Sequence, residues 1–303
     1  MIISMVYSGS SLLASNPRRP KIDISNYKHI IPPPDIEEQK ISSNEKPSYR
    51  EDLPRQIYID NPNVRVKKSG RGTAFAIDNK GHWVTARHVV DECDDIFLVL
   101  QKKELPKRLR TYTIKVDGLQ DAQAVKAKLV AKDTHNDMAI LSTRVRPKQH
   151  LAVVDTNYKN SNDYKKSYSF GFPSGSPGEL FSNFIGITKA RIPFSNTIAY
   201  QEVLLWSIVN KNPNNVSLNG ISGGPTLNNK GKVLGVNTAT LPRRGRFLTS
   251  TPDTLNMFIK SHKINYSSVN EKKNVSLDKD NYINNANLLR KDNIVAQIIC
   301  HKT

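Results

Sequence analysis

Short apolar and β-branched segments recur along the middle of the chain, separated by residues that favour turns. From about residue 61 these segments follow one another at intervals of about 10 to 20 residues, and Gly, Pro, Asn and Asp lie between them. Almost no segment between them has a helical period. The segments are TAFAI, HWVTARHVV, DIFLVL, TYTIKV, AKLVAK, MAILSTRV, YSFGF, FIGITKARI, EVLLWSIV, KVLGVNTAT and RFLTS. This pattern predicts an all-β sandwich or barrel.

The first clear helical pattern comes late, directly after the last of these segments. Thr251 offers an N-cap, Pro252 suits the first helical turn, and Asp253 supplies an early carboxylate. Apolar residues at 255, 258 and 259 then mark one face of the expected helix. Residues 263–303 are rich in Asn and Lys until the apolar run 294–300, which we expect to form a final strand.

The first 60 residues have a different texture. Residues 1–16 begin with a short apolar run, but no Lys or Arg precedes it. We interpret them as a weak or truncated export signal, with an N-terminal anchor and a disordered terminus as the alternatives. Residues 17–60 contain seven prolines among balanced charges, and no apolar period survives there. We expect a linker or an extended segment.

The composition narrows the class of protein. The chain has 303 residues with 45 Lys and Arg against 27 Asp and Glu, a formal net charge of +18. No window approaches the roughly 18 to 20 consecutive apolar residues of a membrane-spanning helix, so we expect no membrane span in the core. The two cysteines are too few for a disulfide-built miniprotein or a four-thiolate zinc site. We find no metal-binding or cofactor-binding motif, and we expect neither group.

The excess of basic residues raises the question of nucleic-acid binding. Residues 1–60 are electrically balanced, so the excess lies in the middle of the chain and not in a basic arm. There the basic residues alternate with apolar ones, and no zinc-finger, RNP-type or helix-turn-helix pattern accompanies them. This indicates a solvated basic surface and no nucleic-acid partner. A strongly salt-dependent affinity for nucleic acid would contradict that interpretation.

Three short segments carry candidate chemistry. They are TARHV around His88, NDMAIL around Asp137 and GISGGP around Ser222. Each alone has an ordinary structural explanation, as a surface histidine, a residue that opens a strand or a tight glycine turn. The separations are 49 and 85 residues, close to the about 45 and about 93 residues of a His, Asp, Ser triad in that chain order. Together the three segments predict an acyl-transfer site.

These segments resemble the trypsin-like serine peptidases of the chymotrypsin fold, and specifically the bacterial branch with HtrA-like protease domains. KVLGVNTA after Ser222, Gly171–Pro173 and Pro242–Arg246 add to the resemblance, which covers about residues 61–260. It implies two six-stranded antiparallel β-barrels with a C-terminal helix and tail. We therefore expect a peptidase domain at 61–262 and a tail at 263–303. That tail is too short for the PDZ domain of HtrA proteins.

The resemblance implies a role for each matched residue. Ser222 would be the nucleophile, His88 the general base, and Asp137 the group that orients the imidazole. The backbone N–H groups of Gly220 and Ser222 would form the oxyanion hole. The implied function is a serine endopeptidase that acts on proteins or peptides through an acyl-enzyme. The alternative is a catalytically inactive barrel that serves as a binding protein.

Two departures from trypsin concern activation and specificity. Ile221 stands where trypsin has an Asp that pairs with a newly cut N-terminus, so activation by N-terminal cleavage is not expected. Val216 stands at the pocket floor, and with Asn237, Thr238 and Ala239 it forms the expected substrate pocket. An apolar floor disfavours Lys or Arg and predicts a small or medium apolar P1 residue. The alternative is an acidic P1, bound by the arginines at 243, 244 and 246.

The two cysteines lead to a prediction about the compartment. Cys93 follows His88 by five residues, and Cys300 ends the apolar run 294–300. Chymotrypsin-type barrels often have a disulfide on the strand that leaves the catalytic His, so we expect a Cys93–Cys300 bond. Such a bond persists in oxidising compartments, which predicts a periplasmic or secreted bacterial protein. Two unrelated buried thiols in a cytosolic protein are the alternative. The sequence predicts neither the natural substrate nor the oligomeric state.

Overall fold

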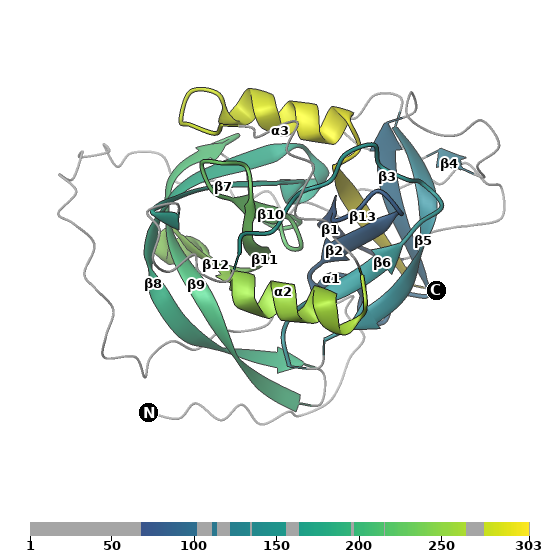
Figure 1. Cartoon of the computed structure of the whole chain (residues 1–303), viewed down its shortest axis with the longest axis horizontal. Helices are drawn as coiled ribbons and strands as arrows, with labels where there is room; N and C mark the ends of the chain where they lie inside the picture. Colours follow the sequence, from purple (N-terminus) through teal and green to yellow (C-terminus); the bar gives the residue numbers. More distant parts are fainter. Residues whose placement is uncertain are drawn as a thin grey trace.

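Two β-barrels lie side by side, with two longer helices against their outer surfaces (Figure 1). The computed structural model describes residues 68–101, 111–113, 122–133, 135–155, 164–194, 197–214, 216–264 and 276–302. The export signal expected at 1–16 and the linker expected at 17–60 lie outside the described residues.

The first barrel has six strands in the order β3-β13-β1-β2-β6-β5, and a pairing between β5 and β3 closes it. Neighbouring strands are antiparallel throughout. A short strand, β4 (Tyr112–Thr113), pairs with the start of β5. The six barrel strands are β1 (Lys68–Ala76), β2 (His82–Thr85), β3 (Asp95–Gln101), β5 (Ala122–Lys132), β6 (Ala139–Ser142) and β13 (Val295–Lys302).

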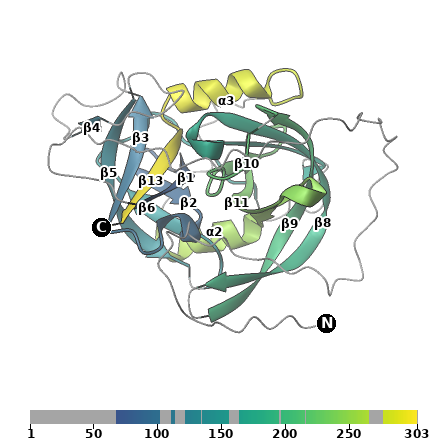
Figure 2. The same cartoon turned by 180° about the vertical axis from the view of Figure 1, so that it is seen from behind.

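The last strand of the chain, β13, completes this first barrel. It pairs with β1 from Lys68↔Lys302 to Phe75↔Val295, and on its other edge with β3 from Asp95↔His301 to Val99↔Gln297. Figure 2 shows β13 between these two strands. The apolar run at 294–300 therefore forms a strand, as predicted. Its place between β1 and β3 was not predicted, because a local pattern does not specify the partners of a strand.

The second barrel is formed by one continuous part of the chain. It closes in the order β10-β11-β12-β9-β8-β7, and its core includes Trp206, Phe247 and Leu234. The hairpin of β8 and β9 is much longer than its neighbours and extends past the barrel (Figure 1). The two antiparallel six-stranded barrels confirm the predicted fold class. The strands are β7 (Lys166–Gly171), β8 (Gly178–Phe194), β9 (Thr197–Asn212), β10 (Pro225–Leu227), β11 (Val233–Leu241) and β12 (Arg246–Ser250).

Few of the described residues are helical. The helix predicted after residue 250 is α2 (Pro252–Ser261), and the Thr251 hydroxyl accepts a hydrogen bond from the Thr254 N–H at 3.2 Å, as an N-cap does. The helix α3 (Tyr282–Lys291) was not predicted, because its sequence is rich in Asn. Shorter helical elements among the described residues are α1 (Arg87–Val90) and the 3₁₀ turns η4 (Pro173–Gly175) and η5 (Pro242–Arg244).

A disulfide joins Cys93 to Cys300, with their Cα atoms 5.3 Å apart. This pairing was predicted, and the Cα separation is within the range that a disulfide spans. Cys93 follows α1 shortly after His88, and Cys300 lies in β13. The bond therefore ties the last strand to the segment that carries the candidate general base.

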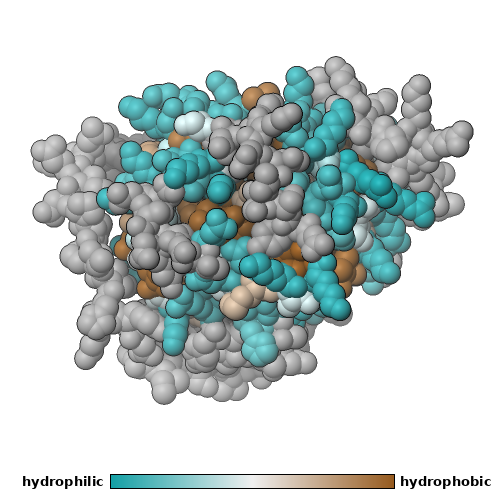
Figure 3. Space-filling view, in the orientation of Figure 1, coloured by the Kyte–Doolittle hydropathy of each residue, from teal (hydrophilic) through white to brown (hydrophobic). Residues whose placement is uncertain are grey.

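On the face shown in Figure 3, hydrophilic residues predominate among the described residues, and apolar ones gather in smaller groups between them. The exposed large hydrophobic residues lie on five different elements: Val130, Ile187, Val209, Met257 and Leu288. None of the described helices is both long and apolar enough to cross a membrane.

Removing the disulfide should destabilise the protein. The bond closes a loop of 207 residues, which corresponds to a limit of roughly 5 kcal/mol in the chain-entropy model. We expect the oxidised protein to unfold at higher urea concentration than the same protein in dithiothreitol. A Cys93→Ala/Cys300→Ala variant should unfold like the reduced protein and be insensitive to the reductant. Equal midpoints for the oxidised and reduced wild type would contradict this expectation.

Candidate active site

His88 and Asp137 contact each other at two points. The Nδ1 atom of His88 lies 2.7 Å from Asp137 Oδ2, and the His88 backbone N–H donates to Oδ1 at 2.9 Å. The Asp137 side chain is fully buried, whereas that of His88 is 23% exposed. The carboxylate therefore fixes both the backbone and the ring of His88, and the ring remains partly exposed.

A turn between β5 and β6 brings Asp137 into place. The Asp133 carboxylate accepts hydrogen bonds from the backbone N–H groups of His135 and Asn136, at 2.8 and 2.9 Å. The Arg87 guanidinium, from the residue before His88, donates to the Asp133 carbonyl at 3.0 Å. The turn that ends at Asp137 is thus fixed to the helix that carries His88.

The second barrel also contacts Asp137. Gln201 on β9 is buried, and its Oε1 accepts a hydrogen bond from the Asp137 N–H at 3.3 Å. The long β8–β9 hairpin thereby reaches the candidate triad from the opposite barrel. Nothing in the local sequence around Gln201 indicated this contact.

Ser222 lies in a tight turn of the second barrel. The turn needs glycine at both sides, because Gly220 has φ +96° and Gly223 has φ +84°. A Cβ atom on Gly223 would collide with Thr73 O and would lie 2.8 Å from the backbone N of Ala86, close to α1. The Thr73 N–H donates to the Ser222 carbonyl at 2.9 Å. These contacts bring the Ser222 turn against the first barrel, beside the segment that leads to His88.

A family model described as a trypsin-like peptidase domain matches residues 72–236, which is more than half of the chain. The chain belongs to the trypsin-like peptidase family. The matched region contains His88, Asp137 and Ser222, and the resemblance drawn from the sequence motifs is confirmed.

The curated relatives of this trypsin-like peptidase share about a quarter of its residues over the matched region. It is 27% identical over 198 residues to Protease Do-like 5, chloroplastic, of Arabidopsis thaliana, covering 64% of this chain and 55% of that protein. It is 25% identical over 189 residues to a probable periplasmic serine endoprotease DegP-like of Chlamydia muridarum, covering 62% and 32%. The chain thus matches about half or less of the length of these relatives.

Among solved structures, the chain is similar to the Rv3671c protease from M. tuberculosis in its active form. The similarity covers 67% of this chain and 77% of that chain, with 19% sequence identity and a TM-score of 0.47.

The residues predicted for the substrate pocket divide into two groups. Val216 and Ala239 are half-buried. Asn237 and Thr238 are buried, and their side chains form internal hydrogen bonds. Asn237 Oδ1 accepts from Thr226 Oγ1 at 2.6 Å, and Thr238 Oγ1 donates to the Leu248 carbonyl at 3.2 Å.

The backbone of Asn237 bonds to the turn that carries Ser222. Its N–H donates to the Gly224 carbonyl at 2.9 Å, and its carbonyl accepts from the Gly223 N–H at 2.8 Å. Asn237 therefore supports the Ser222 turn.

The two positions that depart from trypsin have different environments. Ile221 is 1% exposed and packs in the core of the second barrel, and its side chain carries no charge. Arg243 and Arg244 are exposed in the η5 turn, and Arg246 is half-buried at the start of β12.

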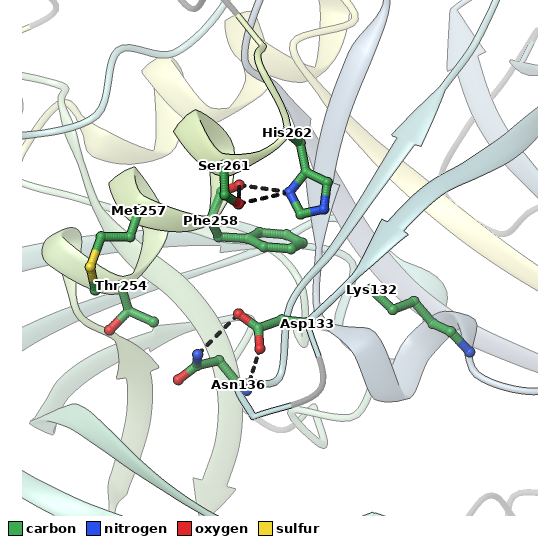
Figure 4. Close-up of a pocket in the computed structure, with 8 residues that line it drawn as sticks. All are labelled: Lys132, Asp133, Asn136, Thr254, Met257, Phe258, Ser261 and His262. Atoms are coloured by element: carbon green, nitrogen blue, oxygen red, sulfur yellow. Dashed lines mark hydrogen bonds between the residues drawn. The ribbon is translucent and has the colours of Figure 1, made fainter.

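A pocket of about 320 Å³ lies next to this site, between the β5–β6 turn and α2 (Figure 4). Asp133 and Asn136 are on one side of it, and Phe258 and His262 are on the other. His88 and Ser222 do not line it, so it is separate from the candidate reaction centre. The described residues include no group of three or more His, Cys, Asp or Glu side chains arranged to hold a metal ion.

Thr73 was not singled out in the sequence, yet it links the two barrels at the site. Its hydroxyl donates to the Gly220 carbonyl at 2.7 Å and accepts from the Phe172 N–H at 3.1 Å. The side chain is fully buried. Its position in GTAFA looks like any strand residue, so only the folded arrangement reveals its role.

Thr73→Val should destabilise the protein by about 1 to 3 kcal/mol, because it leaves the buried Phe172 N–H and Gly220 carbonyl without partners at nearly constant volume. Thr73→Ser keeps the hydroxyl and should lose clearly less stability than Thr73→Val. Urea unfolding of the three proteins measures the difference. A Val variant as stable as the Ser variant would show that the hydroxyl contributes nothing.

Proposed function

We propose that this trypsin-like peptidase is a serine endopeptidase in which Ser222, His88 and Asp137 form the catalytic triad. The observation that carries the proposal is the two-point contact between Asp137 and His88 on the first barrel. The Ser222 turn of the second barrel packs against that barrel, with the Thr73 N–H bonded to the Ser222 carbonyl. A buried carboxylate bonded to Nδ1 is the arrangement that an imidazole needs to act as a base through Nε2.

The reaction follows from these groups. Ser222 Oγ attacks the scissile carbonyl carbon as His88 Nε2 takes the hydroxyl proton. The C–N bond then breaks, and His88 returns the proton to the leaving amine, which leaves an ester on Ser222. Water, deprotonated by the same imidazole, hydrolyses that ester and regenerates Ser222. Asp137 stabilises the imidazolium that forms in each half of the reaction.

The oxyanion donors in this proposal are the backbone N–H groups of Gly220 and Ser222. The positive φ of Gly220 supports the assignment, since it turns the backbone in a way that residues with a Cβ atom rarely adopt. Because Ile221 is buried and apolar, we infer that a newly cut N-terminus plays no part in forming this turn.

The proposed substrates are proteins or peptides with a small or medium apolar P1 residue. The resemblance to trypsin assigns Val216 to the pocket floor, and this assignment supports the choice, because an apolar floor cannot neutralise a buried Lys or Arg. The exposure of Arg243 and Arg244 favours a role on the solvated surface over one in binding an acidic P1.

We propose that the protein functions in the periplasm or is secreted. The Cys93–Cys300 disulfide supports an oxidising compartment. The relative from Chlamydia muridarum is described as periplasmic, whereas that from Arabidopsis thaliana is chloroplastic.

Substitution of the triad tests the enzyme against an inactive binding barrel. Ser222→Ala, His88→Ala and Asp137→Ala should each remove most peptidase turnover and leave the circular dichroism spectrum unchanged. Because the three residues act as a unit, each double variant should lose little beyond its worse single variant. A fluorophosphonate probe should label wild type and not Ser222→Ala. Folded wild type that resists the probe would favour the binding protein, and strictly additive losses would contradict the triad.

Specificity is tested by cleavage of a peptide library that varies P1. We expect cleavage after Val, Ala, Leu or Thr and little after Lys or Arg. A Val216→Asp variant should shift the preference toward basic P1 residues, because a carboxylate at the floor would pair with them. Efficient cleavage after Lys or Arg by wild type would overturn the pocket assignment.

A further inference from the structure

A buried ion pair joins the C-terminal helix α3 to the second barrel. The guanidinium of Arg290 on α3 and the carboxylate of Glu179 on β8 are 2.6 Å apart, and their side chains are 4% and 2% exposed. Asn212 donates to the other carboxylate oxygen at 2.6 Å. Burial lowers the pKa of Arg290, and the Glu179 charge opposes that shift. Charges so deeply buried are costly unless they are fully paired.

Arg290 also holds both ends of one turn. Its Nη2 donates to the carbonyl of Gly171, the last residue of β7, at 3.2 Å, and to that of Gly178, the first residue of β8, at 2.9 Å. These two glycines face each other in the β7–β8 ladder. The guanidinium carbon lies 5.6 Å from the centre of the Phe172 ring, within the turn itself. The turn at 172–177 is thus closed at its base by a residue from the end of the chain.

The tip of the same turn contacts the turn that carries Ser222. The Ser174 N–H donates to the Asn219 carbonyl, and Ser174 Oγ donates to the Ser217 carbonyl at 3.2 Å. A Cβ atom on Gly220 would lie 2.5 Å from the Phe172 carbonyl oxygen. The 172–177 turn therefore packs directly against the residues that precede the nucleophile.

The bond to Asn219 sets the direction of the next N–H group. The peptide between Asn219 and Gly220 is planar and trans, so its carbonyl and its N–H point in opposite directions. With the carbonyl held by Ser174, the Gly220 N–H points away from the 172–177 turn. We propose that Arg290, with Glu179, is a positioning residue that holds the 172–177 turn and through it fixes the Gly220 N–H as an oxyanion donor.

This inference rests on the proposed function only for its catalytic consequence. Neither Arg290 nor Glu179 lies in the candidate triad, so both would act through the 172–177 turn. The structural part, the coupling of α3 to residues 217–221, can be measured without any turnover.

The test uses a variant that removes both charges of the full-length protein, Arg290→Met/Glu179→Gln. No unpaired charge is left buried, and the amide oxygen at 179 can still accept the Asn212 bond. Arg290→Lys serves as a second variant, since its ammonium keeps a positive charge near Glu179, but the shorter side chain does not bring a donor to the position of Nη2, which contacts both glycine carbonyls. Leu289→Ala is the control, because it removes a buried side chain from the same helix without altering the guanidinium.

We expect the double variant to fold and its kcat to fall about tenfold to a hundredfold. This fall is at most near the lower end of the about 100- to 1000-fold fall in kcat that follows the loss of a whole oxyanion donor. KM should stay within about twofold of wild type. The affinity of a peptide aldehyde, which places an oxyanion in the hole, should fall by the same factor as kcat. Arg290→Lys should show a smaller loss of the same kind. The amides of residues 217–221 should exchange with solvent faster in the double variant than in Leu289→Ala.

Two results would overturn the proposal. One is unchanged exchange at 217–221 in the folded double variant. The other is a fall in kcat no larger than that of Leu289→Ala, which would mean that Arg290 contributes only to the general stability of the protein. If wild type shows neither turnover nor probe labelling, the proposed function fails, and the exchange comparison alone still decides whether Arg290 holds the turn.

Discussion

Closure of the first barrel by β13 is the constraint on which the rest of the structure depends. Without β13, the facing edges of β1 and β3 would each expose a row of unpaired backbone groups. The strand supplies those partners, is buried from Val295 to His301, and carries the disulfide to Cys93. β1 in turn carries Thr73, and β3 follows the helix of His88. His88 and Asp137 thus stand on a barrel that β13 completes.

The site itself belongs to the junction of the barrels. His88 and Asp137 come from the first barrel and Ser222 from the second, and backbone and side-chain hydrogen bonds cross between them at Thr73 and Gln201. Buried polar groups of this kind are stable only when each has a partner, so one relative placement of the barrels satisfies them best. That requirement fixes the relative positions of groups that lie far apart in the sequence.

The sequence predicted what is local or follows from a specific motif. The strand pattern, the N-cap at Thr251, the family and the cysteine pairing all carry signals in a few neighbouring residues or in a known combination of them. Partners across the fold carry no such signal. Thr73 resembles any strand residue, and the Asn-rich sequence of α3 hides both the helix and Arg290. The position of β13 between β1 and β3 is likewise a property of the pairing and not of the strand. The assigned roles of the site residues stay predictions.

The order of the strands also has a consequence during synthesis on the ribosome. Every strand of the second barrel lies between residues 166 and 250, so that barrel can close while the rest of the chain is still being made. The first barrel begins at residue 68 and stays open until β13 emerges, some 230 residues later. Until then His88 and Asp137 lie on an incomplete sheet. The first barrel therefore cannot close before β13 has been made, so the sheet that carries His88 and Asp137 is the part of the fold completed last.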